Sequence, residues 1–232
     1  MGIAYDAARK RVVIFGGLGF SGFWGDTWTW DGRTWTKQNP TSSPSPRSNP
    51  GMVYDGARQQ VVLYGGFTGG GFLNDTWVWD GTDWTQLSPS SFPPKRADVG
   101  MAYDIAMGQT VLFGGDSSQV FDDTWTWDGT TWTKLSPPTA PGPRYAHAMA
   151  YDAFHQQVVL FGGTDVGLLG DTWTWDGTTW TEQAPASSPS PRKYPGLAYD
   201  AARRQVVLFG GSEVDFFGDT WTWDGINWTE HG

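Results

Sequence analysis

The chain has 232 residues, a formal net charge of −9 and no cysteine, which together exclude several classes of protein. Without cysteine there is no disulfide framework, no thiolate metal site and no cysteine nucleophile. The net acidity argues against nucleic acid and anionic membranes as partners. The sequence has no apolar signal segment and no apolar run long enough to span a bilayer, so we expect a soluble protein whose compartment is unknown.

One segment, Asp-Thr-Trp-x-Trp-Asp-Gly-x-x-Trp-Thr, recurs five times along the chain. The copies start at Asp26, Asp75, Asp123, Asp171 and Asp219. A period near 48 residues, with strand-type patterning in each unit, is typical of a β-propeller that has one blade per repeat. The sequence therefore predicts an all-β fold, a single propeller of five blades. We expect the blades to cover residues 1–40, 41–89, 90–137, 138–185 and 186–232.

Each unit is predicted to form four short antiparallel strands, A to D in chain order. In the fourth unit these lie at residues 146–151, 157–161, 172–175 and 179–182, with an Asp-Gly turn between the last two. Strand A is rich in Gly, Ala and Met, which suits a crowded axis, so we expect it to be innermost and strand D outermost. The two Trp of strand C point to one face. With the Trp of strand D they are predicted to fill the space between blades, as Trp28, Trp30 and Trp35 do in the first unit.

The repeat resembles the kelch repeat, in a Trp-rich form of bacterial type. The resemblance rests on the Gly-Gly that closes strand B, on Phe-Leu-Asn-Asp-Thr-Trp-Val-Trp-Asp at residues 72–80, and on the Trp of the last strand. It covers the whole chain, although Trp79 stands where kelch repeats more often have Tyr. Kelch propellers more often have six or seven blades, so five repeats either close as a small ring or belong to something longer.

The five units differ mainly in the loop between strands B and C. This B–C loop is one residue longer in the first two units, and its composition changes from Gly and aromatic residues at 18–25 to acidic and polar residues at 116–122. Antiparallel strands place the B–C loops and the D–A connections on the same face of the propeller. Because loops carry function more often than the scaffold does, we expect a binding surface on this B–C/D–A face, and drift in unconstrained loops is the alternative.

Six residues are candidate ligand contacts on this face. Four are arginines at one repeat position just before strand A, and the others are His147, at the start of a strand A, and Trp24, the single Trp outside the repeating triads. The arginines are Arg47, Arg96, Arg144 and Arg192. A ring of guanidinium groups around one opening suits a carboxylate or phosphate, and in some kelch proteins that this chain resembles, arginines here take acidic peptide segments. The alternative is that each arginine pairs with a neighbouring Asp.

No pattern in the sequence indicates an enzyme. The three His residues are scattered, there is no Ser-His-Asp nucleophile motif, and the copper radical oxidases that share the kelch scaffold need a Tyr–Cys crosslink. Loop acids could form a glycosidase pair, but none stands in a catalytic context. They are Asp98, Asp116, Asp165, Glu213 and Asp215. We expect a non-catalytic module without cofactor or metal, which binds a protein segment or an anionic ligand on the B–C/D–A face. Carbohydrate binding or glycoside chemistry, and a scaffold without ligand, are the alternatives.

Overall fold

The computed structural model describes residues 1–231 as twenty strands in five antiparallel sheets of four strands each. Blade 1 contains β1 (Gly2–Asp6), β2 (Arg11–Gly19), β3 (Gly22–Trp30) and β4 (Trp35–Lys37). Blade 2 contains β5 (Gly51–Asp55), β6 (Gln60–Thr68), β7 (Gly71–Trp79) and β8 (Trp84–Leu87). Blade 3 contains β9 (Gly100–Asp104), β10 (Gln109–Phe113), β11 (Thr124–Trp127) and β12 (Trp132–Leu135).

Blade 4 contains β13 (Ala148–Asp152), β14 (Gln157–Phe161), β15 (Thr172–Trp175) and β16 (Trp180–Gln183). Blade 5 contains β17 (Gly196–Asp200), β18 (Gln205–Phe209), β19 (Thr220–Trp223) and β20 (Trp228–His231). In every sheet the strands lie in chain order. The predicted five-bladed propeller with four antiparallel strands per blade is confirmed.

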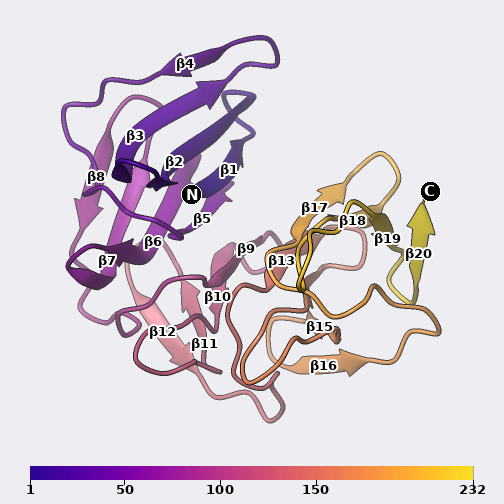
Figure 1. The fold of residues 1–232 in the computed structure, drawn as a ribbon. Helices are drawn as coiled ribbons and strands as arrows, with labels where there is room; N and C mark the ends of the chain where they lie inside the picture. Colours follow the sequence, from indigo (N-terminus) through magenta and orange to yellow (C-terminus); the bar gives the residue numbers. More distant parts are fainter. Residues whose placement is uncertain (232) are drawn as a thin grey trace.

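The first strand of each blade is the innermost one. Strand β1 packs against β5, β5 against β9, β9 against β13, and β13 against β17, and the blades follow one another around this inner row (Figure 1). The inner strands carry Gly, Ala and Met where they approach their neighbours. A Cβ added to Gly51 would lie 2.3 Å from the sulfur of Met101, so the small residues predicted for the axis are required by packing.

The turn between the third and fourth strands depends on its Asp. In blade 4, Trp175 pairs with Trp180, and the four residues between them form the loop. Oδ1 of Asp176 accepts hydrogen bonds from the backbone N–H of Thr178 and Thr179, both at 2.8 Å. Gly177 has φ of 98°, which only glycine adopts readily. The Asp-Gly of each repeat is therefore turn chemistry.

The B–C loops differ in shape as well as in sequence. In blades 1 and 2 the second and third strands continue past the Gly-Gly as long hairpins, with a register shift between Phe15 and Gly17 and between Tyr64 and Gly66. In blades 3 to 5 the strands end earlier, and isolated bridges such as Asp116 to Val120 close shorter loops. The additional residue that the first two units carry is accommodated in these longer hairpins.

Four of the junctions between blades are built in the same way. The Trp that opens the last strand donates from Nε1 to a Thr hydroxyl of the preceding blade at 2.8–3.0 Å. The same indole packs edge-on against a Phe or Tyr of that blade, with ring centroids 5.2–5.4 Å apart. The four Trp–Thr pairs are Trp84–Thr27, Trp132–Thr76, Trp180–Thr124 and Trp228–Thr172.

Blades 1 and 5 do not form this junction with each other. Strand β17 makes no contact with β1 comparable to the other inner-strand pairs of the described chain, and Figure 1 shows the two blades standing apart. Trp35 is 44% exposed, whereas its equivalent Trp84 is 1% exposed, and Phe209 of blade 5 is 58% exposed. The prediction that Trp28, Trp30 and Trp35 fill an inter-blade space is therefore wrong for Trp35, because no blade covers that face.

Candidate functional site

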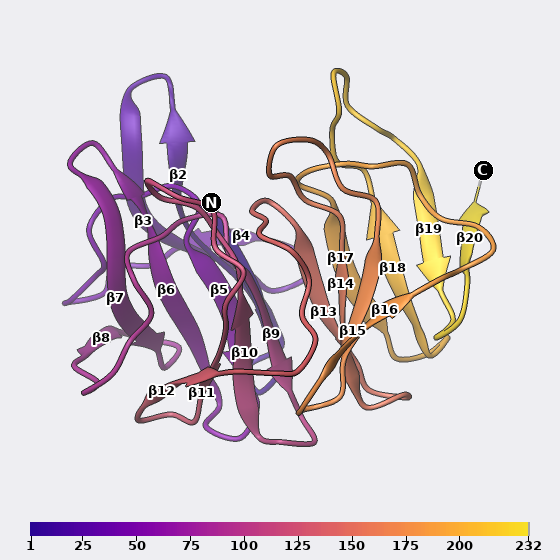
Figure 2. The same cartoon turned by 90° about the horizontal axis from the view of Figure 1, so that it is seen from below.

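The B–C loops gather at one end of the molecule, where the tips of the β2–β3 hairpin and of the β18–β19 loop lie at the same edge (Figure 2). Four large apolar side chains on these loops are almost fully exposed to solvent. They are Phe20, Val166, Val214 and Phe216. They are the most exposed large hydrophobic side chains of residues 1–231, so the face predicted to vary is also the face with the most accessible apolar groups.

Beside these loops, a row of left-handed residues runs around the mouth of the central channel. Asn49, Asp98, Ala146 and Tyr194 have φ between 50° and 56° and occupy one repeat position before the inner strand. Each except Asn49 donates its backbone N–H to the carbonyl of the preceding member, at 3.1, 3.0 and 2.7 Å. A left-handed backbone conformation is unfavourable for residues other than glycine, and the hydrogen bonds between blades hold these residues in it.

Two carboxyl groups lie close together at this mouth. Burial raises the pKa of Asp98, and Asn49 and Tyr194 lie against its carboxyl group. Burial and then the charge of Asp98 raise the pKa of Asp116 to about 6, and Oδ1 of Asp116 is buried without a hydrogen-bond partner. The mouth of the channel is therefore acidic in character, with a pair of carboxyls that resist simultaneous ionisation.

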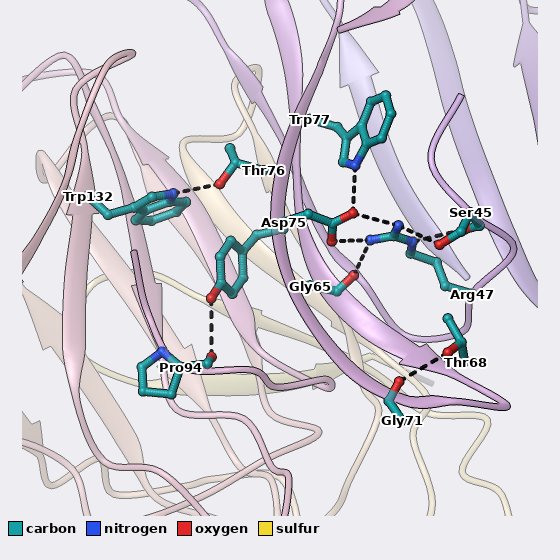
Figure 3. Close-up of polar contacts among 11 residues, drawn as sticks. Ser45, Arg47, Gly65, Thr68, Gly71, Asp75, Thr76, Trp77, Pro94 and Trp132 are labelled. Atoms are coloured by element: carbon teal, nitrogen blue, oxygen red, sulfur yellow. Dashed lines mark hydrogen bonds and ion pairs between the residues drawn. The ribbon is translucent and has the colours of Figure 1, made fainter. Parts of the chain in front are cut away.

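The four candidate arginines do not point into this opening. Arg47, Arg96, Arg144 and Arg192 are buried, and each forms an ion pair with the Asp that begins the Asp-Thr-Trp of the following blade, at 2.5–2.7 Å. Figure 3 shows Arg47 between Asp75, Gly65 and Ser45. Our expectation of an exposed positive ring is wrong, and the alternative of an Asp partner holds, because the guanidinium donors are used within the fold.

Arg47 shows how complete this pairing is. Its Nη1 and Nη2 donate to both carboxylate oxygens of Asp75, Nη1 also donates to the Gly65 carbonyl at 2.9 Å, and Nε and Nη2 donate to Ser45. Meanwhile its backbone bonds blade 1, with N donating to the Trp24 carbonyl at 3.0 Å and O accepting from Gly17 at 2.8 Å. Each such arginine therefore joins two neighbouring blades, and it cannot contact a ligand unless its ion pair opens.

The arginines also determine how their Asp partners titrate. Burial alone raises the pKa of Asp75, Asp123 and Asp171, but the hydrogen bonds and charge of their arginines outweigh it, so each pKa lies below its usual value. The hydrogen bond from Arg192 is the main reason that the pKa of Asp219 is lowered. All four carboxylates remain ionised at neutral pH.

His147 is also buried, contrary to a role in ligand contact. It stands at the repeat position that Pro50, Val99 and Pro195 occupy in other blades, and its ring lies edge-on to Phe113 at 5.7 Å. Neither ring nitrogen has a hydrogen-bond partner, and burial, followed by the charge of Arg144, lowers its pKa to about 3. The imidazole is therefore neutral and serves as an apolar filler between blades.

Trp24 is exposed, as its position outside the Trp triads indicated. It is 52% exposed and borders a groove of about 1080 Å³ along the uncovered side of blade 1, together with Trp28 and Trp35. A second cavity, of about 650 Å³, follows the inner strands and is lined by Met52, Met101 and Met149 among others. Sequence reasoning missed the groove because it exists only where the fifth junction is not formed.

Within residues 1–231, no group of three or more His, Asp or Glu side chains could hold a metal ion. No helix there is long and apolar enough to cross a bilayer. The loop acids Asp165, Glu213 and Asp215 lie next to the exposed apolar tips in the sequence.

Fold and repeat together define the class of this protein: a β-propeller of Trp-rich, four-stranded Kelch-type blades. Residues 2–139 match the KLHDC2/KLHL20/DRC7 Kelch-repeats domain, which is more than half of the chain. The chain belongs to the Kelch-repeat family. Comparison with curated proteins gives no significant match.

Proposed function

We propose that this Kelch propeller is a non-catalytic module that binds a protein segment across its B–C loop face. One observation carries the proposal: Phe20, Val166, Val214 and Phe216 are nearly fully exposed on loops of the same face. Binding residues are carried disproportionately on loops that a rigid scaffold positions, and these four side chains are on loops of that kind. Kelch domains commonly bind proteins, and the family membership supports the same conclusion.

The charge of this face favours an apolar segment with a basic group over an acidic one. The acidic ligand expected from the sequence depended on exposed arginines, and these are paired inside the fold. Carboxyl groups at the channel mouth and loop tips include Asp98, Asp116 and Glu213, and Lys95 and Lys193 adjoin the same loops. Like-charge contacts across an interface are costly, and the chain has a net charge of −9, so an acidic segment is disfavoured.

Peptide selection against the immobilised chain tests the proposal. We expect the selected peptides to be apolar. Their affinity should fall at least about tenfold in Phe20→Ser and in Phe216→Ser, because replacing an aromatic residue of an interface by a small one often costs more than 1 kcal/mol of binding free energy. Ile226→Ser is the matched control, since Ile226 is exposed on a turn between the outer strands at the other end of the blade. Equal losses in all three variants, or selection of no peptide, would oppose loop-face binding.

Carbohydrate binding is the second candidate, and the exposed indole of Trp24 favours it. Aromatic faces stack on apolar faces of sugars, and Trp24 borders the groove on blade 1. A glycan titration monitored by tryptophan fluorescence separates the two: a response that Trp24→Ala removes and Phe216→Ser leaves intact would support sugar binding.

A further inference from the structure

Each blade has an A–B turn, which joins its first two strands and follows an Asp. In four blades the side chain three residues after that Asp contacts its carboxyl group, with 2.7–2.9 Å between nitrogen and oxygen. Three of these partners are arginines and one is a histidine. The pairs are Asp6–Arg9, Asp55–Arg58, Asp152–His155 and Asp200–Arg203. The A–B turn is therefore suited to hold a basic group against a carboxyl group.

In blade 3 this basic partner is replaced by a thioether. The residues at the two positions are Asp104 and Met107. Asp104 is 1% exposed, its Oδ1 accepts a hydrogen bond from the backbone N–H of Met107 at 3.1 Å, and within residues 1–231 it forms no ion pair. Burial raises the pKa of Asp104, whereas hydrogen bonds from Arg203 lower the pKa of Asp200. Asp104 is thus a buried carboxyl group without a cation.

The other acceptors that hold the arginine of an A–B turn belong to the next blade. Nη1 of Arg9 donates to the Gln59 carbonyl at 2.9 Å, and Arg58 donates to the Asp128 carbonyl. Gln156 has the same φ as Gln59, 55°, so the backbone at the junction of blades 3 and 4 keeps the geometry of this position. The equivalent carbonyls at that junction are those of Gln156 and Asp176.

A cavity of about 130 Å³ lies at this junction. Asp104 and Met107 line it from blade 3, and Trp175 lines it from blade 4. The equivalent cavity between blades 1 and 2 is lined by Arg9. Arg9 and Arg58 are 37% and 35% exposed, so a cation at this place reaches the surface of the molecule. Met107 is 53% exposed, and because methionine is unbranched and flexible, its side chain can turn aside and admit a cation from solvent.

Large apolar side chains adjoin this cavity on the A–B turns of blades 3 and 4. Ile105 is 63% exposed and Phe154 is 54% exposed. The other four blades carry Ala or Gly at each of these two positions. Ile105 is two residues from Met107, and Phe154 is two residues from Gln156. Apolar and aromatic contacts around a buried arginine are typical of the centre of a protein interface.

We propose that the pocket between the A–B turns of blades 3 and 4 binds an arginine side chain of a partner polypeptide that has an apolar residue beside it. The guanidinium binds the carboxylate of Asp104 and the carbonyls of Gln156 and Asp176. These are the acceptors that the arginines of this chain use at the equivalent places. Ile105 and Phe154 contact the apolar residue of the partner.

The charges of the two partners are complementary. The chain has a net charge of −9, and the pocket adds a carboxyl group with no cation of its own. Arginine suits the pocket better than lysine, because its planar fork donates several hydrogen bonds at once to acceptors that converge. In antiparallel blades the A–B turns are at the opposite end from the B–C loops, so this pocket does not depend on peptide binding at the loop face.

The test is a titration of the full chain with the peptide acetyl-Leu-Ala-Arg-Ala-Leu-amide, monitored by calorimetry. The matched peptide carries citrulline, which keeps the planar shape of arginine and lacks its charge. We expect the citrulline peptide to bind at least about tenfold more weakly, because hydrogen bonds between ionised groups are about twice as strong as neutral ones. A lysine peptide should fall between the two, since lysine lacks the planar fork.

Variants of the chain complete the design. Met107→Arg gives blade 3 the pair that Arg58 forms in blade 2, so it should raise the urea midpoint of unfolding and abolish binding of the arginine peptide. Asp104→Asn keeps an acceptor for the turn and should weaken that peptide at least about tenfold. Two controls should leave the affinity unchanged: Glu182→Gln, on the exposed part of β16, and Phe216→Ser, in a B–C loop. The comparison of peptides uses the unaltered chain, so it holds even if a variant folds poorly.

Several results would overturn the proposal. Equal affinity for the arginine and citrulline peptides is one, and no binding of the arginine peptide below about 10 mM is another. Unchanged affinity in a folded Met107→Arg, or a loss in Phe216→Ser that Asp104→Asn does not share, would place the arginine elsewhere on the molecule. Self-association in light scattering that Asp104→Asn abolishes would assign the pocket to a second copy of this chain.

Discussion

Replacing Arg96 with alanine should be among the most destabilising single substitutions in this propeller. Arg96 is fully buried and Asp123 is 8% exposed, so the variant leaves a carboxylate that is desolvated and unpaired. Removing one partner of a buried ion pair costs about 3–5 kcal/mol. The Gly114 carbonyl loses its donor and the Phe121 ring loses its cation, so we expect the upper part of that range.

Urea unfolding at neutral pH, followed by tryptophan fluorescence, measures this effect. The urea concentration at the midpoint should fall while the dependence of the unfolding free energy on urea stays unchanged. The matched comparison is Asp123→Asn against Asp26→Asn. The first leaves a buried guanidinium without its partner and should cost about 3–5 kcal/mol. The second removes a carboxylate that has no arginine in this chain and should cost about 1 kcal/mol or less.

A double substitution distinguishes pairing from packing. Replacing Arg96 by Met and Asp123 by Leu together removes both charges and should recover much of the stability lost in Arg96→Ala. A loss below about 1 kcal/mol in Arg96→Ala, or equal effects of Asp123→Asn and Asp26→Asn, would refute the view that the arginines hold neighbouring blades together.

Three further predictions concern other parts of the fold. Trp84→Ala should cost about 3–5 kcal/mol in urea unfolding, and Trp35→Ala less than half as much, because Trp35 lacks a covering blade. Gly65→Ala should cost about 1–3 kcal/mol, since its Cβ would lie 2.5 Å from the Arg96 carbonyl oxygen at φ of 61°. Gly70→Ala should be close to neutral, because its Cβ would meet only the Thr68 hydroxyl, at 3.7 Å. Folding raises the pKa of Asp116 to about 6. Its contribution to stability is therefore present below its unfolded pKa and is lost as the pH rises through about 6. Asp116→Asn should raise the free energy of unfolding by about 1 kcal/mol at pH 7, with screening by solvent included, and by much less at pH 4.

Much of the blade could be predicted from the sequence because its signals are local. The period of the Asp-Thr-Trp segment, the Gly-rich inner strand and the Asp-Gly turn each follow from chain geometry within one unit. The turn around Asp176 and the pairing of Trp175 with Trp180 illustrate this. Repetition then extends one correct unit to the whole fold.

The partner of each arginine could not be derived in the same way. The repeat located Arg47 just before an inner strand, but the direction of its side chain depends on the distance between two blades. One signal was available: Asp75, Asp123, Asp171 and Asp219 each follow an upstream arginine by 27 or 28 residues. This regularity favours pairing.

The exposed edge of blade 1 depends on the curvature of the whole propeller. Trp35 and Trp84 occupy the same repeat position and differ in exposure because only one of them faces another blade. No local pattern encodes the rotation between blades. Similarly, the sequence identified the variable B–C loops, but the near-complete exposure of Phe20 and Phe216 required the arrangement of the hairpins in space.

Amide hydrogen exchange of the chain, with and without a selected peptide, tests most directly whether the B–C loop face is the binding surface. We predict slower exchange at residues 18–22, 165–167 and 213–216, which carry the exposed apolar tips, and unchanged exchange in the turns at 105–108 and 224–227. Protection confined to those turns, or no protection in the B–C loops at saturating peptide, would contradict the proposed function.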